Sequence, residues 1–497
     1  MEKYEGEKKS GLFKISEQEE AHGDLSINGW NTLLTLTAKD FFDVPDGGTI
    51  LGKLHDRTKI SLLNCTRLGL TTGNRQDDRY HGANVFPHLV AFGSEHLAYT
   101  DNAIASVHFL VDDAATLFYD FDAFGKVVHN RQDIIDAIIR DNAETHSRAI
   151  KFGEHPEIFY FTGKREIFSV ETSIGTVSAN HRIGYTFPGP KGFNLKNKIF
   201  ATIKFTKPVC TSRCITDVLT LIRFFEIIVG RPQNVLELTF QLLSAEDRPT
   251  LLDVYWCMRP VRANESEGRK PHPADTLLDA VDTPNVFGGV LKSWLEQHPS
   301  RREARFRFSS GFAEMNNFSI DRLVGAANMF DILPESATPA PQPLSEEIVE
   351  AQKTSRAAFL KLPDSPERSS VLGALGRLGK NTLKQKIRSR AKLVSDATGD
   401  RFPELELVAN EAVNCRNYFV HGTESKILYS ESNDFLSFLT ETLEFIFAAS
   451  DLIDAGWDIG AWCKEGTTMS HPFSRYRVNY AMALAHLKSA LSQTAKT

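Results

Sequence analysis

Hydrophobic and polar residues alternate through much of the first 210 or so residues, a pattern typical of half-buried β-strands. The alternation has a period of two at residues 105–111 and 199–205. Residues 51–54 and 59–65 form two further strand-like runs, and the polar residues 55–57 between them predict a hairpin turn. The N-terminal part of the chain is therefore expected to be rich in β-structure.

A helical pattern interrupts these strands. Apolar residues recur at spacings of three and four from Ile215 to Val229, and Gly230 and Pro232 then end the helix. Strand alternation returns at residues 236–242. A β-rich domain with at least one packed helix follows from this order, and it favours a sandwich or a barrel over a parallel α/β sheet.

From about residue 285 onward the apolar spacing is helical, so we expect an all-α bundle. Together these patterns predict an α+β protein, with a sandwich-like β-rich domain over residues 1–280 and a helical domain over residues 285–497. Four prolines between residues 334 and 343 are interpreted as a loop between helices, but they could instead mark the domain boundary. The predicted helices are Val286–Gln297, Ser319–Ile332, Ser345–Leu362, Val371–Asp396, Phe402–His421, Asp434–Asp454 and Ser474–Leu491.

Composition narrows the class of protein. The net charge of −6 argues against general polyanion binding, so any contact with nucleic acid would need a local basic patch. The six cysteines are scattered, which suits reduced thiols. The N-terminus has no apolar signal core, and the most apolar helix, residues 435–453, contains three acidic residues. We therefore expect a cytoplasmic protein without membrane contact.

A basic strip lies between Glu367 and Asp396, where the chain has no acidic residue. Such a strip can follow a phosphate backbone, which makes its cations candidate RNA-binding residues. The alternative is an ordinary solvated helix face. The candidates are Lys380, Lys384, Lys386, Arg388, Arg390 and Lys392, with Arg377 just ahead of them.

The strongest chemical signal is the predicted helix Phe402–His421. Its apolar stripe and the glycine that follows it, Gly422, are typical of a packed helix with a left-handed stop. Three asparagines and His421 fall together on the opposite face. Asparagine is a poor helix former, so this face is expected to have polar partners. The stripe is Leu405, Val408, Ala412, Cys415 and Phe419, and the asparagines are Asn410, Asn414 and Asn417.

Arg416 and His421 bring a cation and an imidazole to the end of this helix. The helix dipole favours the protonated imidazole, Asn417 could orient the ring, and Arg416 could grip a phosphate. Since the two positions are about 140° apart round a helix, we expect the side chains of one chain to diverge. Two copies about a twofold axis would then form the site. The alternative is that Arg416 pairs with a carboxylate and His421 only caps the helix.

The Arg416-Asn417-x3-His421 helix end, inside an all-helical C-terminal region, resembles the HEPN ribonuclease superfamily. With a long β-rich half ahead of it, the chain is most similar to ApeA-type anti-phage defence proteins, which join an ApeA N-terminal domain to an ApeA-like HEPN domain. Arg416, Asn417 and His421 match the family motif position by position. The resemblance therefore implies that these three residues are catalytic.

The implied activity is an endoribonuclease that needs no metal and no cofactor. The ribose 2′-OH would attack the adjacent phosphorus and leave a 2′,3′-cyclic phosphate and a 5′-OH. Similarity to the ApeA type implies a toxin-like effector of abortive infection, with host or phage RNA, tRNA among the candidates, as its substrate. It also implies a homodimer or higher oligomer, and a β-rich domain that senses a phage-derived trigger. The alternatives are a non-catalytic HEPN-like module that binds RNA or protein, and a β-sandwich ligand binder with a helical oligomerisation tail.

Overall fold

The computed structural model describes residues 3–16, 19–44, 46–75, 78–128, 133, 136–137, 140, 157–186, 189–243, 249–258, 270–340, 343–423, 427, 429 and 433–494. Contacts divide the chain into a β-rich unit of residues 1–218, 234–260 and 279–288 and a helical unit of residues 219–233, 261–278 and 289–497. Helices α3 (Thr211–Val229) and α4 (Pro284–Phe312) contribute residues to both units. The two units are therefore interleaved along the sequence.

The β-rich unit contains a sheet whose strand pairings, among the described residues, are all antiparallel. Its strands follow the order β10-β11-β12-β7-β13-β14-β6-β3-β2-β1-β4-β5, and β5 pairs back onto β6. Strands β8 (Phe124–Val128) and β9 (Glu157–Phe161) form a separate hairpin. The sheet strands are β1 (Lys8–Lys14), β2 (Glu20–Ser26), β3 (Leu33–Ala38), β4 (Gly48–Leu54), β5 (Lys59–Arg75), β6 (Asp78–Gly93), β7 (Ile104–Val111), β10 (Glu166–Thr172), β11 (Gly175–Tyr185), β12 (Leu195–Val209), β13 (Val235–Leu242) and β14 (Thr250–Trp256).

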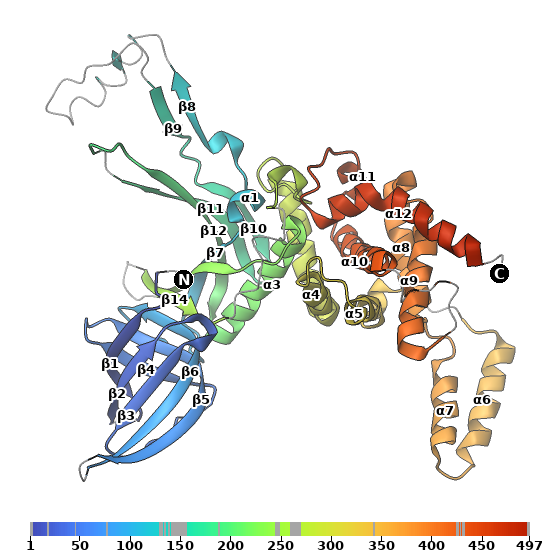
Figure 1. Ribbon diagram of the computed structural model, residues 1–497, viewed down its shortest axis with the longest axis horizontal. Coiled ribbons are helices and arrows are strands. Elements are labelled where there is room, and N and C mark those ends of the chain that lie inside the picture. The colour runs from blue at the N-terminus through green and yellow to red at the C-terminus, as the bar shows by residue number, and fades with distance from the viewer. Residues whose placement is uncertain are drawn as a thin grey trace. The chain divides into compact units, whose positions relative to one another are not determined.

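The pairing of β5 with β6 closes strands β1 to β6 into a barrel (Figure 1). The barrel interior is apolar and centres on the fully buried ring of Phe13. Gly23 and Gly52 make room for that ring, since a Cβ atom on either would lie only 2.4 or 2.5 Å from it. Closure removes the exposed edges of these strands. Of the sandwich and the barrel that the sequence favoured, the structure has the barrel, extended through β14 into an open sheet.

The helical unit confirms most of the predicted helices. The exception is the continuous helix predicted over residues 371–396, which is wrong: the chain forms α7 and α8 with a break between them. Gly379 adopts a φ of +81° in this break, and Thr382 starts α8 with a capping box that includes Gln385. The helices of this region are α5 (Ile320–Asp331), α6 (Glu346–Leu360), α7 (Pro366–Arg377), α8 (Leu383–Thr398), α9 (Leu405–His421), α10 (Asn433–Asp454), α11 (Ile459–Trp462) and α12 (Pro472–Thr494).

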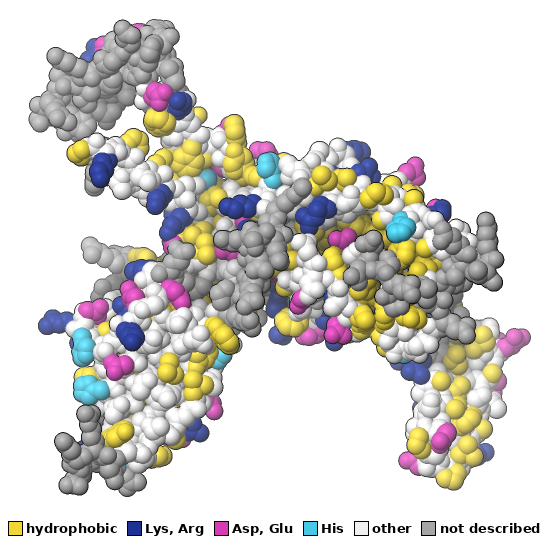
Figure 2. All heavy atoms as spheres, in the orientation of Figure 1, with side chains coloured by type: hydrophobic (Ala, Val, Ile, Leu, Met, Phe, Trp, Pro, Cys, Tyr) yellow, Lys and Arg dark blue, Asp and Glu magenta, His cyan; other side chains and the backbone are white. Residues whose placement is uncertain are grey.

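Helices α6 and α7 form a hairpin that contributes no buried side chain. Figure 2 shows hydrophobic side chains on its surface, and Ile348 and Leu360 are about half exposed, at 46% and 51%. Across the described part of the chain, no helix is both long enough and apolar enough to span a bilayer.

A buried ion network joins α4 to α10. The carboxylate of Asp451 accepts hydrogen bonds from Arg301 and Arg305, each at 2.8 Å, and all three side chains are nearly inaccessible to solvent. Arg301 also pairs with Asp454, at 2.7 Å, and Arg390 of α8 pairs with the same carboxylate at 2.7 Å. Burial alone would raise the pKa of Asp451, but the charges of Arg305 and Arg301 hold it below its ordinary value. The network therefore stabilises the fold only while every charged partner is present, because loss of one would leave a buried charge unpaired.

Asp451→Asn should destabilise the helical unit by about 3–5 kcal/mol, because it leaves two buried arginines without their shared anion. The same substitution at Asp396, which pairs with Lys392 on the exposed surface of α8, is the matched control and should cost no more than about 1 kcal/mol. Urea unfolding of the intact chain measures both variants. Equal midpoints for the two variants would show that the network contributes little.

Candidate active site

Helix α9 carries the Arg416–His421 segment, and its two ends are set by left-handed backbone. Glu404 precedes the helix with a φ of 56°, and Gly422 follows it with a φ of 62°. The Gly422 amide closes the last turn by donating to the Tyr418 carbonyl at 3.0 Å. The predicted stripe is buried from Leu405 to Cys415, where α9 packs against α5, α8 and α10. Because the apolar face packs against these helices, the last turn of α9 is directed toward the surface.

Arg416 and His421 of one chain are in contact, which corrects the expectation that they diverge. The Arg416 Nη1 atom lies 2.9 Å from His421 Nε2 and 3.0 Å from Asn417 Oδ1. The angular separation of the two Cα positions is real, but the guanidinium group of a long side chain can cross it past Asn417. A single protomer therefore brings the three predicted catalytic residues together.

The contact constrains the protonation of the imidazole in this conformation. A guanidinium group only donates hydrogen bonds, so His421 Nε2 must be the acceptor and the ring proton must be on Nδ1. His421 is exposed and Arg416 is half-buried, so both are within reach of a ligand at the helix end. Arg416 Nε has no hydrogen-bond partner among the described residues. Because this Nε atom is itself buried, an anion such as a phosphate would have to be bound by the terminal nitrogens of the guanidinium group.

A buried carboxylate on the same helix was missed by the sequence analysis. Glu411 accepts hydrogen bonds from Asn414, at 3.0 Å, and from the hydroxyl of Tyr429 beyond the end of α9. It ties the chain beyond α9 to the helix and so positions the last turn. The spacing of Glu411 and Asn414 was a readable signal, whereas Tyr429 is brought in by the fold alone. Asn414 and Asn417 have the polar partners that the asparagine face predicted.

Cys415 lies next to these residues but is not a nucleophile. Burial raises the pKa of its thiol to about 12, and the negative charge of Glu411 adds to this effect. The thiol therefore stays protonated at neutral pH and packs as a small apolar group.

The predicted RNA-binding strip is divided by the fold. Arg390 is buried and bonded to Ser450 and Asp454, so it belongs to the ion network and not to an exposed strip. Lys386 also turns inward, where its Nζ atom donates to the Asp331 carbonyl at 2.7 Å. The sequence spacing could not distinguish these two residues from their neighbours. Which cations of a helix are buried depends on the elements that pack against it, and the sequence of the helix does not show them.

The remaining cations of the strip are exposed. Lys384, Arg388 and Lys392 follow each other at intervals of four residues on one face of α8, and Lys380 lies before the helix. Arg388 lies 3.6 Å from Glu406, and Lys392 lies 3.1 Å from Asp396, but these pairs are on the surface and exchange readily with other ions. An exposed positive face on α8 therefore exists, and it is smaller than the sequence predicted.

Comparison with protein families identifies the chain. The model of ApeA N-terminal domain 1 matches residues 8–294, more than half of the 497 residues. The chain belongs to the ApeA family. A second model, Apea-like HEPN, matches residues 324–459 of this ApeA family member, a span that contains Arg416, Asn417 and His421. No curated protein and no solved structure matched.

The two matches confirm the resemblance inferred from the helix end and from the β-rich half before it. They also show that α8, with its exposed cations, and α9, with Arg416 and His421, lie in the same HEPN match.

Proposed function

We propose that this ApeA family member is a metal-independent endoribonuclease of the HEPN type. The observation that carries the proposal is the contact between Arg416 and His421 at the exposed end of a helix within the HEPN match. A cation and an imidazole side by side are the groups that cleavage of a phosphodiester by the neighbouring ribose hydroxyl requires.

The reaction follows from these groups. His421 accepts the proton of the ribose 2′-OH once a substrate phosphate has drawn Arg416 away from Nε2. The 2′ oxygen then attacks the adjacent phosphorus, and the Arg416 guanidinium neutralises the charge on the pentacoordinate intermediate. The bond to the 5′ oxygen breaks, that oxygen takes a proton, and the products are a 2′,3′-cyclic phosphate and a 5′-OH. Asn417 positions Arg416 through its amide oxygen. The nucleophile belongs to the substrate, so the step requires no metal.

A homodimer would supply both an acid and a base. One imidazole cannot be deprotonated for the 2′-OH and protonated for the 5′ oxygen at the same moment, whereas two copies of His421 about a twofold axis can divide these roles. The end of α9 offers a surface for such a contact, since Val420 next to His421 is 43% exposed.

The proposal extends to the biological role. An HEPN-type defence protein that cleaves host or phage RNA, tRNA among the candidates, would act in the cytoplasm by abortive infection. Its ApeA N-terminal domain would then sense a phage-derived trigger and restrain or release the ribonuclease. The support is the pairing of the two family matches in one chain.

Arg416→Ala and His421→Ala should each lower RNA cleavage about 10²- to 10⁴-fold while the fold is kept, because neither side chain belongs to the buried stripe. Purified protein is incubated with total RNA in EDTA, and the fragment ends are tested for cyclic phosphate. Arg356→Ala on the surface of α6 and His55→Ala in an N-terminal turn are the matched controls and should cleave at the wild-type rate.

Full activity of His421→Ala would remove the catalytic role of this residue. RNA that is bound but never cut, by wild type and variants alike, would favour the alternative of a non-catalytic HEPN-like binding module.

Val420→Glu should convert the native dimer to a monomer, since it would bring two like charges together at the twofold contact. Val478→Glu is the matched control, because Val478 on α12 is equally exposed, at 44%. Sedimentation equilibrium measures the native mass of both variants in the His421→Ala background. A monomeric mass before any substitution contradicts the shared site.

Removal of Lys384, Arg388 and Lys392 together should weaken RNA binding and make its salt dependence shallower. Each lost contact to single-stranded RNA lowers the slope of log affinity against log salt by about 0.7, so three contacts correspond to about 2. Fluorescence anisotropy across a salt series, in the His421→Ala background, measures the slope. The alanine triple at Lys353 and Arg356 on α6 and Lys361 just after it is the matched control. An equal slope for both triples would mean that α8 presents only a solvated face.

A further inference from the structure

A polar cavity lies in the helical unit, and no residue of the candidate active site is among those that line it. Its outer chamber has a volume of about 430 Å³, within the usual range for a small-molecule site. Arg231, after α3, and Arg475, of α12, line this chamber together with the amides Asn316 and Asn479. Among the described residues that line it there is no carboxylate. The described lining of the chamber therefore carries two cationic side chains and no anionic one, in a protein of net charge −6.

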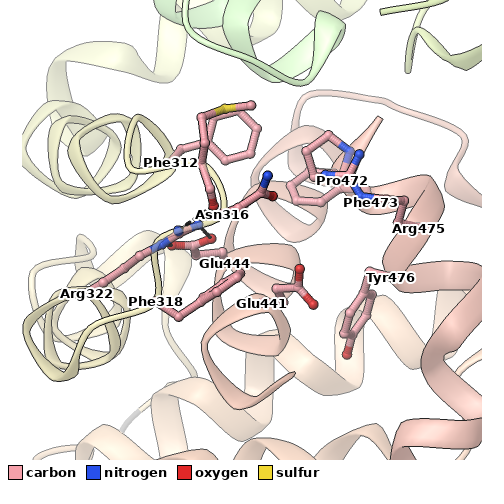
Figure 3. A pocket seen from close by; sticks show the side chains of 11 residues that line it. Phe312, Asn316, Phe318, Arg322, Glu441, Glu444, Pro472, Phe473, Arg475 and Tyr476 are labelled. Atoms are coloured by element: carbon pink, nitrogen blue, oxygen red, sulfur yellow. Dashed lines mark hydrogen bonds and ion pairs between the residues drawn. The ribbon is translucent and has the colours of Figure 1, made fainter. Parts of the chain in front are cut away.

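A narrow recess continues from the chamber, because Asn316, Pro472 and Arg475 line both (Figure 3). The recess has a volume of about 20 Å³, which is room for one small polar group. Its walls are largely aromatic. They include Phe312, Phe318, Phe473 and Tyr476.

Two carboxylates line the recess, and their situations differ. Glu444 is paired by two hydrogen bonds of 2.8 Å with Arg322. Glu441 makes no hydrogen bond and no ion pair with the described residues, and Figure 3 shows its carboxylate directed into the open space of the pocket. Burial, with the charge of Glu444, raises the pKa of Glu441 to about 7. The side chain of Glu441 is half-buried, and a carboxylate in such a recess without a hydrogen-bond partner is the feature that a ligand donor would satisfy.

The chamber wall is preorganised. Gly230, with a φ of +84°, packs so closely on His471 that a Cβ atom would lie 2.4 Å from the ring. The His471 ring is fully buried and is fixed by the Ile227 carbonyl and the Phe473 amide. Asp275 is buried and accepts hydrogen bonds from Thr467, Thr468 and the lining residue Ser470, which stabilise its charged form and hold this segment in place. Little of the binding energy would be spent on ordering the site.

We propose that the chamber and the recess bind a nucleotide whose base carries an amino group. The phosphate lies between Arg231 and Arg475, the base lies against the aromatic residues at the mouth of the recess, and the amino group donates to Glu441. The small volume of the recess would make binding selective for a base with an amino group, because the recess admits the edge of a base and not a whole ring. This ligand is distinct from the RNA proposed for Arg416 and His421.

The test uses the intact protein in the His421→Ala background, so binding is measured whether or not the wild type cleaves RNA. Isothermal titration calorimetry compares AMP, CMP, UMP and inorganic phosphate. AMP and CMP should bind about 10-fold or more tightly than UMP, since only they donate an amino group to the Glu441 carboxylate. Glu441→Met should abolish this preference, and Arg231→Gln should weaken all three nucleotides alike by about 10-fold. Arg302→Gln on the exposed surface of α4 is the matched control.

Glu441→Gln serves as a second variant that keeps the volume and polarity of the side chain, and thermal melting verifies that every variant is folded. The proposal is overturned if no nucleotide binds, if phosphate binds as tightly as AMP, or if Arg302→Gln matches the loss in Arg231→Gln.

Discussion

The helical unit depends on the neutralisation of Asp451 by arginines of α4. Removing a carboxylate and two guanidinium groups from water costs several kcal/mol for each ion, and only close hydrogen bonds compensate for that cost. Arg301 and Arg305 make such bonds at 2.8 Å, and Arg390 extends the network to α8 through Asp454. Apolar packing tolerates small shifts of one helix along another, but this network does not. It therefore fixes the mutual positions of α4, α8 and α10.

The candidate active site takes its position from those helices. Helix α9 packs on α8 and α10 through its buried stripe, which leaves Arg416 half-buried and His421 exposed at the last turn. Glu411 and Tyr429 then hold the chain that continues beyond the helix. The buried ion network thus positions this segment indirectly, through the packing of α9 on α8 and α10. The buried hydrogen bond between Glu411 and Tyr429 positions it directly.

The arginines described in this unit have contrasting surroundings. Arg301, Arg305 and Arg390 neutralise buried carboxylates and are unavailable to any ligand. Arg416 is shared between an amide and an imidazole, and Arg388 is exposed on α8. The guanidinium group suits each place because it stays charged when buried and offers five donors in one plane. The residues adjacent to an arginine in the sequence do not show which of these surroundings it has.

The sequence by itself determined the class of the fold and which polar side chains stand at the end of one helix. Period-two alternation is local, so it predicted the β-rich half, and the helical spacing around Cys415 predicted α9 with its glycine stop. The match of Arg416, Asn417 and His421 to a family motif is likewise a property of adjacent residues. Tertiary structure decided what depends on distant partners. Closure of the barrel needs the pairing of β5 with β6, and the burial of Arg390 needs Asp454.

The Arg416–His421 contact illustrates both what the sequence predicts and what only the tertiary structure decides. Helix geometry correctly placed the two Cα atoms apart, but it does not describe where a flexible side chain comes to rest, and the local surroundings of Asn417 led Arg416 to His421. Nothing in the sequence indicated the polar chamber and its recess, because Arg231, Asn316, Glu441 and Arg475, which line them, come from four separate segments. Residues that are far apart in the chain have no common period, and only packing brings them to one cavity.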